Sequence, residues 1–359
     1  MKPYKAVKLP VADIDYNQFI EKLSQANRYL ARFDGMLESI PNKYIFLTPF
    51  MTQEAVLSSK IEGTRATFQE VLEFDANINK YSDKKDDILE IKNYRKAMEH
   101  AVRRLKSMPL CSRLIREMHS ILMNDVRGKT RDPGSFRKTQ NWIGKPGSTI
   151  ETASFVPPSP EMLIDIMSKF EEYLNFNDKD VIVQTAIIHG QFEIIHPFSD
   201  GNGRIGRMFV PLFFYIKGVM SEPVFYISSY FEKNRDDYYK NLNHITSGGD
   251  WDQWIAFFID AVAVQSQEYI DKIKKINDLY EIYKDKVLEI TRSQRIIQIL
   301  DTLFTVPVFR SVQFSELSGI PQKTCERHIR QLYEAGILSS DDQEKQRTYL
   351  FKDLLELME

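Results

Sequence analysis

The stretch His196-Pro-Phe-Ser-Asp-Gly-Asn-Gly-Arg-Ile-Gly-Arg207 decides both the fold and the chemistry of this 359-residue chain. It is a polar, glycine-rich turn that runs into an apolar segment, and we expect a helix from Asn202 to about Lys217. The N-terminus of a helix leaves backbone N–H groups unpaired and carries partial positive charge, so it is a ready anion site. Gly201 and Gly203 permit backbone conformations that a Cβ would resist, and they let a phosphate approach closely.

The charged side chains of this stretch fit a polyphosphate. Arg204 and Arg207 are three residues apart, so both project from one helix face near the N-terminal end, where the helix dipole favours acids and these cations need an anion. Asp200 is a hard oxygen ligand suited to Mg2+. His196, at the loop entrance, can take a proton from an attacking hydroxyl. Each feature alone is typical of ordinary structure, but their coincidence within twelve residues is highly specific.

The same residues carry a family resemblance. They match every fixed position of the Fic motif, His-x-Phe-x-Asp/Glu-Gly-Asn-Gly-Arg-x-x-Arg, and the chain resembles Fic proteins over roughly residues 40–265. The resemblance implies a helical fold, ATP as co-substrate, Mg2+, and transfer of AMP to a Ser, Thr or Tyr hydroxyl of a protein, possibly of the enzyme itself. By this resemblance His196 is the base, Asp200 binds Mg2+, and Arg207 holds the γ-phosphate.

The resemblance also implies the nucleotide-binding residues. They comprise Gly201, Asn202, Gly203, Arg204, Ile205, Gly206 and Arg207 of the motif, Thr152, Ala153, Ser154 and Phe155 of a flap that lines up the target's backbone, and the aromatic pair Tyr238 and Tyr239. Adjacent tyrosines are also common in helix cores, so for this pair a structural role stays open.

An inhibitory segment is expected near residue 60. Glu62 falls in the last turn of a predicted helix, where the dipole disfavours an acid, so it needs a nearby cation. Ser58 lies one turn earlier on the same face and can orient it. The segment resembles the Ser/Thr-x-x-x-Glu-Gly/Asn motif of Fic proteins with an N-terminal inhibitory helix, known as class II. That resemblance implies that Glu62 pairs with Arg207 and displaces the γ-phosphate; the alternative is a solvated surface glutamate.

Apolar spacing predicts a mainly α chain. Short apolar pairs around a Lys-Pro-Gly turn predict a β-hairpin flap, and the order of the C-terminal elements predicts a winged helix-turn-helix. The resemblance implies that the remaining helices form a Fic-type bundle. We expect helices over about 19–30, 49–62, 85–106, 112–123, 161–175, 181–194, 202–217, 234–246 and 250–288, a further helix opened by the capping box Thr67-Phe-Gln-Glu70, and the flap between Arg127 and Pro160. The domain boundaries predicted are 1–85 for the N-terminal region with the inhibitory helix, 86–288 for the catalytic domain and 289–359 for the winged helix.

The predicted winged helix has nearly balanced charge, but its candidate recognition helix carries Lys323, Arg327, His328 and Arg330. This pattern is compatible with a helix that enters a DNA groove. Winged helices also dock proteins or form dimers, so DNA binding, protein binding and a homodimer all stay open.

Composition limits the kinds of partner and the cellular compartment that we expect for this chain. The formal net charge is −2, which excludes a chain that binds nucleic acid through its overall charge. Two distant cysteines, Cys111 and Cys325, suit a reducing cytosol and are too few for a disulfide framework or a zinc site. We find no signal-peptide pattern and no apolar run of the ~20 residues that span a bilayer, so we expect a cytoplasmic protein without a membrane partner.

The leading hypothesis is a protein adenylyltransferase held in check by Glu62. The first alternative keeps the fold and changes the chemistry: transfer of another nucleotide or phosphate, or removal of AMP with Glu62 activating water. The second is a DNA-binding regulator that only senses nucleotide, against which the intact His196 argues because a sensor needs no base.

Overall fold

The structure is a computed structural model that describes residues 2–76, 81–124, 132–144, 147–340 and 347–358. Parts of three predicted features lie outside these residues: the start of the flap region around Gly128, the Lys145-Pro146 step of the flap turn, and the turn after Ser340.

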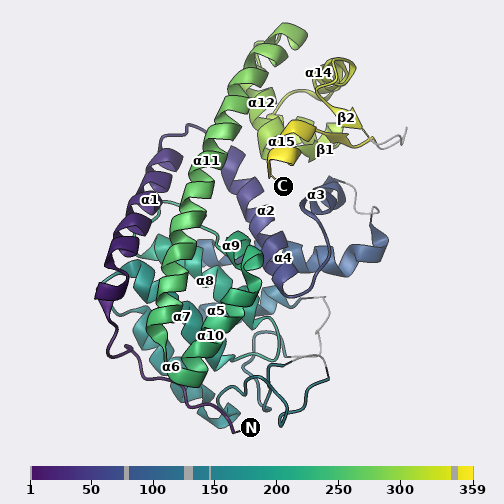
Figure 1. Cartoon of the computed structure of the whole chain (residues 1–359). Coiled ribbons are helices and arrows are strands. Elements are labelled where there is room, and N and C mark those ends of the chain that lie inside the picture. The colour runs from purple at the N-terminus through teal and green to yellow at the C-terminus, as the bar shows by residue number, and fades with distance from the viewer. Residues whose placement is uncertain (1, 77–80, 125–131, 145–146, 341–346, 359) are drawn as a thin grey trace.

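Helices make up most of the described chain (Figure 1). The N-terminal helices are η1 (Tyr16–Gln18), α1 (Ile20–Glu38), α2 (Tyr44–Ile61), α3 (Phe68–Ala76), η2 (Ser82–Lys84), α4 (Lys85–Leu105) and α5 (Ser112–Leu122). The central helices are η3 (Pro160–Met162), α6 (Leu163–Leu174), α7 (Val181–Ile195), α8 (Asn202–Ile216), α9 (Ser228–Lys233), α10 (Arg235–Gly248) and α11 (Trp251–Thr291). The C-terminal elements are α12 (Ile296–Thr305), β1 (Val308–Phe309), α13 (Ser311–Ser318), α14 (Gln322–Glu334), β2 (Ser339–Ser340), β3 (Tyr349–Leu350) and α15 (Lys352–Met358).

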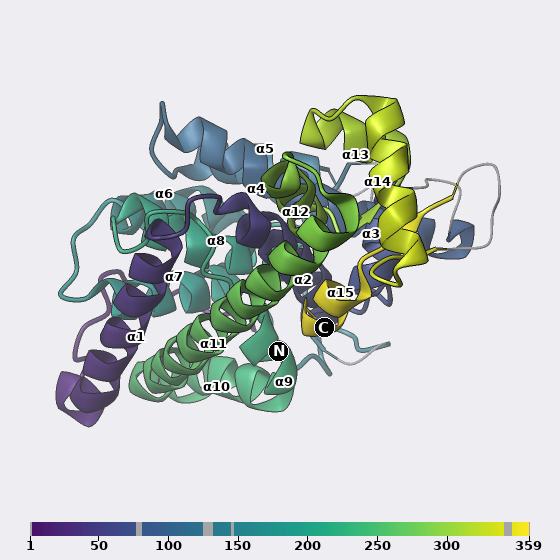
Figure 2. The same ribbon diagram turned by 90° about the horizontal axis from the view of Figure 1, so that it is seen from above.

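The core is built around α7, almost every residue of which is buried. This helix packs against α6, α8 and α11, while α1 runs along α11, as Figures 1 and 2 show from two directions. A helix that is apolar on all sides needs neighbours on all sides, so α7 is fixed at the centre of the bundle. Its C-terminal end and the N-terminal end of α8 enclose the His196–Gly201 loop.

Local sequence signals explain several helix ends. The predicted capping box at α3 is present: the Glu70 amide donates to Thr67 Oγ1 at 3.2 Å, and the Thr67 amide donates to Glu70 Oε2 at 2.9 Å. Asp180 caps α7 by accepting from the amides of Ile182 and Val183. These bonds satisfy N–H groups that would otherwise have no partner in the first turn of each helix.

Two predictions about regular structure need correction. The expected β-hairpin flap contains, in its described residues, a single antiparallel bridge between Ile143 and Phe155, because glycines and prolines limit ladder formation there. Helix α2 begins at Tyr44 rather than near Pro49, because buried Ile45 and Phe46 extend its apolar face beyond the proline. The short elements α9, β1 and α15 had no signal strong enough to predict them.

The C-terminal elements form a small three-stranded sheet beside helices. Strand β3 lies between β1 and β2, and both pairings are antiparallel. The order of helices, turn and strands is compatible with the predicted winged helix-turn-helix. In this region α12 packs against α11 and α2, and β1 packs against α3.

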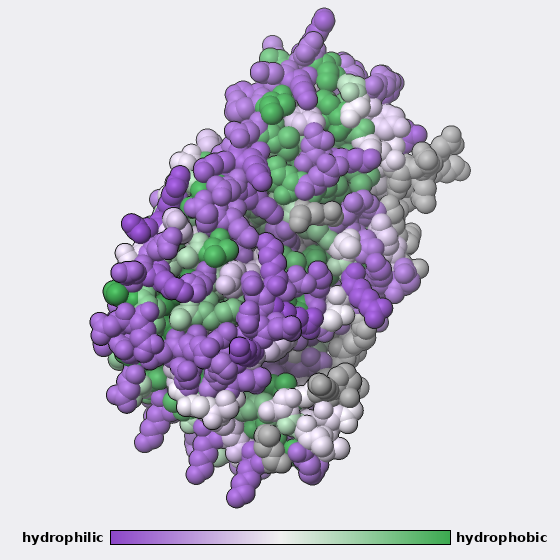
Figure 3. All heavy atoms as spheres, in the orientation of Figure 1, coloured by the Kyte–Doolittle hydropathy of each residue, from purple (hydrophilic) through white to green (hydrophobic). Residues whose placement is uncertain are grey.

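Among the described residues, none of the helices combines the length and the apolar character that crossing a bilayer requires. The face in Figure 3 is largely hydrophilic, and hydrophobic residues gather on it where the upper part of α11 meets the C-terminal elements.

Candidate active site

The loop between α7 and α8 is held in one shape by its own side chains. His196 ends α7 in the left-handed conformation, with φ 48°, and Gly201 precedes α8 with φ 77°. The Asn202 side chain accepts from the Phe198 amide at 2.9 Å and donates to the Phe198 carbonyl at 2.8 Å. Phe198 is fully buried. Because both groups of the Asn202 amide bond to the Phe198 backbone, this side chain holds the shape of the loop.

His119, from α5, supports the same loop from below. Its ring stacks on Phe198 with centroids 3.7 Å apart and planes 4° apart. Its Nδ1 accepts from the Gly134 amide at 2.9 Å, which leaves the proton on Nε2 to donate to the Asp200 carbonyl at 3.0 Å. Burial lowers the pKa of His119 to about 4, so this ring stays neutral and supports the loop structurally.

His196 is partly buried, and its surroundings favour the neutral imidazole. Burial, and to a lesser extent the charge of Arg137, lowers its pKa to about 4, while the Glu193 carbonyl, 3.3 Å from Nδ1, and the carboxylates of Glu62 and Asp200 oppose this shift. The imidazole is therefore neutral at physiological pH. Sequence reasoning missed Arg137, which is 3% exposed and donates from Nε to the His196 carbonyl at 2.9 Å.

Arg207 forms the ion pair that the inhibitory motif implied. Its Nη2 lies 2.7 Å from Glu62 Oε1 and 2.8 Å from the Ser58 carbonyl, and its Nε donates to Ser58 Oγ at 2.8 Å. Arg207 is 1% exposed, whereas the Glu62 side chain is 35% exposed. Burial raises the pKa of Glu62, but the charge and hydrogen bond of Arg207 outweigh this effect and hold it below its usual value.

Arg204 faces a carboxylate that sequence reasoning missed. Its Nη1 lies 2.9 Å from Glu90 Oε2 of α4, and its Nη2 lies 3.6 Å from Asp200 Oδ1. Glu90 has no recognisable signal in the sequence, since it is one acid among several in a charged helix. The Ile205 side chain is fully buried and its amide donates within α8, so Ile205 offers no group to a nucleotide.

A cavity of about 840 Å³ opens beside α8, and eight of the predicted site residues line it. Its walls include His196, Gly203, Arg207 and Glu62 from the motif and the inhibitory turn, Ser154 and Phe155 from the flap, and Tyr238 and Tyr239 from α10. Thr152 and Ala153 do not line it; the Thr152 hydroxyl instead meets Thr149 in a local turn. A cavity of this size is ample for a nucleotide.

The floor of the cavity contains buried titratable groups. Behind the cavity wall, His189 Nδ1 donates to the Gly206 carbonyl at 2.9 Å, and its Nε2 accepts from the Tyr238 hydroxyl at 3.0 Å, so His189 supports α8 and α10. Tyr238 is buried in this aromatic core, while Tyr239 is 39% exposed. Glu193 also lines the cavity, and burial raises its pKa to about 8. A carboxyl with such a pKa at a cavity wall is typical of functional sites.

A helical bundle with a glycine-rich loop at a helix N-terminus defines the class of protein. Residues 20–103 match the model of the Fic/DOC family N-terminal region, and residues 109–214 match the Fic/DOC family model. The chain therefore belongs to the Fic/DOC family.

Sequence relatives include the protein adenylyltransferase fic-1 of Caenorhabditis briggsae, 29% identical over 178 residues that cover 46% of this chain and 32% of the relative. The protein adenylyltransferase Fic of Nematostella vectensis is 27% identical over 192 residues, which cover 50% of this chain and 40% of the relative. The chain thus spans about a third of the length of the curated relatives it matches.

Solved structures share the fold. A Fic family protein from Desulfovibrio desulfuricans G20 superposes with a TM-score of 0.60 at 15% identity, covering 98% of both chains. Fic-1 of Caenorhabditis elegans, residues 134–508, superposes with a TM-score of 0.52 at 21% identity, covering 72% of this chain and 74% of the other. At these identities the likeness establishes the fold and nothing further.

Proposed function

We propose that this protein is a protein adenylyltransferase that moves AMP from ATP to a Ser, Thr or Tyr hydroxyl of a protein, and that Glu62 inhibits it. The observation that carries the proposal is the contact of 2.7 Å between Glu62 and Arg207 at the wall of a cavity that also contains His196. A relative named as a protein adenylyltransferase in each of several animals supports the choice of reaction.

The residues divide the reaction between them. His196, neutral because it is buried, takes the proton of the attacking hydroxyl. The N-terminus of α8 receives the phosphates, and Arg207 receives the γ-phosphate once Glu62 has left. While Glu62 occupies Arg207, ATP lies with its α-phosphate out of line for attack, and such misplacement removes most of the catalytic advantage of a bound substrate.

Gly203 makes the inhibited arrangement possible. A Cβ at this position would lie 2.2 Å from Glu62 Oε1 and 2.9 Å from Arg207 Nη1. Only glycine allows the carboxylate, and by the same argument a phosphate, to approach the first turn of α8 so closely.

The site fits a magnesium ion that is held jointly by the protein and by the phosphates of ATP. Among the described residues no cluster of three or more metal-binding side chains occurs, so the protein alone does not build a complete cage. Asp200, with its side chain 34% exposed at the loop, offers one carboxylate, and Mg2+ is commonly held by one or two carboxylates together with substrate phosphates. The bound ion would neutralise phosphate charge during transfer.

The experiment that tests the reaction type uses ATP labelled at either the α- or the γ-phosphate, with the Glu62→Gly variant and cell lysate. AMP transfer predicts that protein retains label only from the α position. Label retained from the γ position would mean phosphate transfer, and no label from either would favour a nucleotide sensor.

Removal of AMP stays the second candidate, because Glu62 is close enough to His196 to influence its pKa. A homodimer, a cytoplasmic location, and DNA binding through α14 stay predictions.

A further inference from the structure

The turn that carries Glu62 lies between two helices, and the C-terminal elements contact both of them. Helix α2 ends at Ile61 and α3 begins at Phe68, so Glu62 is in the short connection. Helix α12 packs against α2, and strand β1 packs against α3 (Figure 1). The elements from α12 to α15, here called the C-terminal elements, therefore hold the chain on both sides of the inhibitory turn.

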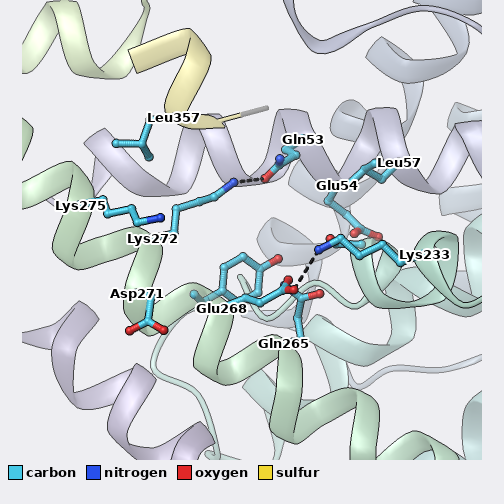
Figure 4. Close-up of a pocket in the computed structure, with 12 residues that line it drawn as sticks. Gln53, Glu54, Leu57, Lys233, Gln265, Glu268, Asp271, Lys272, Lys275 and Leu357 are labelled. Atoms are coloured by element: carbon cyan, nitrogen blue, oxygen red, sulfur yellow. Dashed lines mark hydrogen bonds and ion pairs between the residues drawn. The ribbon is translucent and has the colours of Figure 1, made fainter. Parts of the chain in front are cut away.

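Hydrogen bonds tie α2 to the C-terminal elements at two levels. Just before α2, Asn42 Nδ2 donates to Asp301 Oδ2 of α12 at 2.7 Å. Midway along α2, the Gln53 side chain donates to the Met358 carbonyl at the end of α15. Lys272 of α11 donates to the same carbonyl at 3.0 Å and to Gln53 Oε1 at 3.2 Å (Figure 4). The contact therefore joins three helices through one carbonyl group.

This contact is less well packed than the core. A cavity of about 350 Å³ lies beside it, with Glu54 and Leu57 of α2 and Leu357 of α15 in its walls (Figure 4). Burial lowers the pKa of Lys272 to about 8, and within the described chain this ammonium has no carboxylate at salt-bridge distance. The partly buried Lys272 ammonium is held by neutral oxygens, and the cavity leaves this contact with fewer close-packed atoms than the core.

Movement of α2 would reach the active site directly. Glu54, one turn before Ser58, accepts from the Tyr94 hydroxyl at 3.0 Å and from the Ser228 amide at 3.2 Å, which fixes the middle of the helix. Ser58 and Glu62 follow on the same helix and its end, and both contact Arg207. Since a helix transmits displacement along its axis, loss of support at its outer face loosens both contacts.

We propose that the C-terminal elements act as a splint on the inhibitory turn, so that separating them from α2 and α3 releases Glu62 from Arg207. The proposal rests on the proposed function and names the event that relieves the inhibition: a partner that binds the C-terminal elements better when they are detached. Such a partner shifts the equilibrium only by its difference in affinity for the two states.

The test compares variants of the full chain. Leu357→Asp places a charge in the contact with α2, and Gln53→Ala combined with Lys272→Met removes its hydrogen bonds more gently. Val312→Asp, at a position of α13 that is 57% exposed, is the matched control. Two quantities are measured: hydrogen exchange at the amides of residues 62–64, which bond within the turn, and the rate of AMP transfer with α-labelled ATP.

The splint predicts faster exchange at residues 62–64 and a rise in transfer on the order of tenfold for both contact variants, with no change for the control. In a Glu62→Gly background the contact variants should add nothing, because the inhibition is already gone. Unchanged exchange and rate in folded contact variants would overturn the proposal, as would an equal gain in the Glu62→Gly background. If Leu357→Asp fails to fold, the variant that combines Gln53→Ala with Lys272→Met decides between these outcomes. Absence of AMP transfer in every variant would refute the proposed function. Hydrogen exchange at residues 62–64 would still test whether the C-terminal elements support the turn.

Discussion

At the scale of single residues, the site depends on neutral histidines held by specific acceptors. His119 and His189 each use both ring nitrogens for structure, whereas within the described residues the hydrogen bonds of His196 reduce to one contact of 3.3 Å between its Nδ1 and the Glu193 carbonyl. We predict that His196→Ala abolishes AMP transfer while ATP binding survives, because the base acts on the incoming hydroxyl and not on the nucleotide. Calorimetry with ATP checks this, with His119→Ala as a comparison that should also disturb the loop. Loss of ATP affinity in His196→Ala would make His196 structural.

The pKa of His196 leads to a second prediction. A base whose pKa has fallen from 6.5 to about 4 is already deprotonated near neutrality. Transfer by the Glu62→Gly variant should therefore be nearly constant between about pH 6 and pH 8, with loss only in more acidic solution. Removing the Glu62 carboxylate lowers the pKa of His196 further, which strengthens the expectation. An inflection near 6.5 in the rate profile would show that the imidazole is exposed when it reacts.

Sequence reasoning identified the residues that lie in the motif and missed those that meet it from elsewhere. His196 and Arg207 were predicted because several unusual features coincide within twelve residues, and Glu62 because its segment matches the inhibitory motif of the family. Glu90 and Arg137 are ordinary charges in the sequence, and only the packing of α4 and the flap base against the loop brings them to the site.

At the scale of elements, the joint between α4 and α8 rests on the buried pair Arg204–Glu90, whose side chains are 4% and 9% exposed. We predict that Glu90→Gln destabilises the fold by about 3 kcal/mol, because a buried guanidinium loses its counter-charge. The control is Glu172→Gln, which disrupts the surface pair with Lys169 and should cost less than about 1 kcal/mol. Urea unfolding measures both; equal effects would mean that the buried pair contributes little.

Helices were predictable at this scale because apolar spacing and caps agree, as at α3 and α7. The flap and the small strands were harder, since pairing of two-residue strands depends on partners far away in the chain, as Val308 with Leu350 does.

At the scale of the whole molecule, the N-terminal region, the catalytic loop and the C-terminal elements meet around one helix, α2. This arrangement explains how Glu62, more than 140 residues before Arg207 in the chain, reaches it at 2.7 Å. The motif implied the pair, but only the packing of α2 against α4, α8 and α9 could place it.

The central claim is that Glu62 inhibits by occupying Arg207, and one measurement tests it most directly: the rate of auto-modification with α-labelled ATP in wild type, Glu62→Gly, Arg207→Ala and the double variant. The account predicts that Glu62→Gly is faster than wild type and that adding Arg207→Ala removes the gain, because both residues share one contact. A Glu62→Gly variant no faster than wild type would contradict the account. So would label that accumulates in Glu62→Gly only because removal of AMP has stopped, which a chase with unlabelled ATP would reveal.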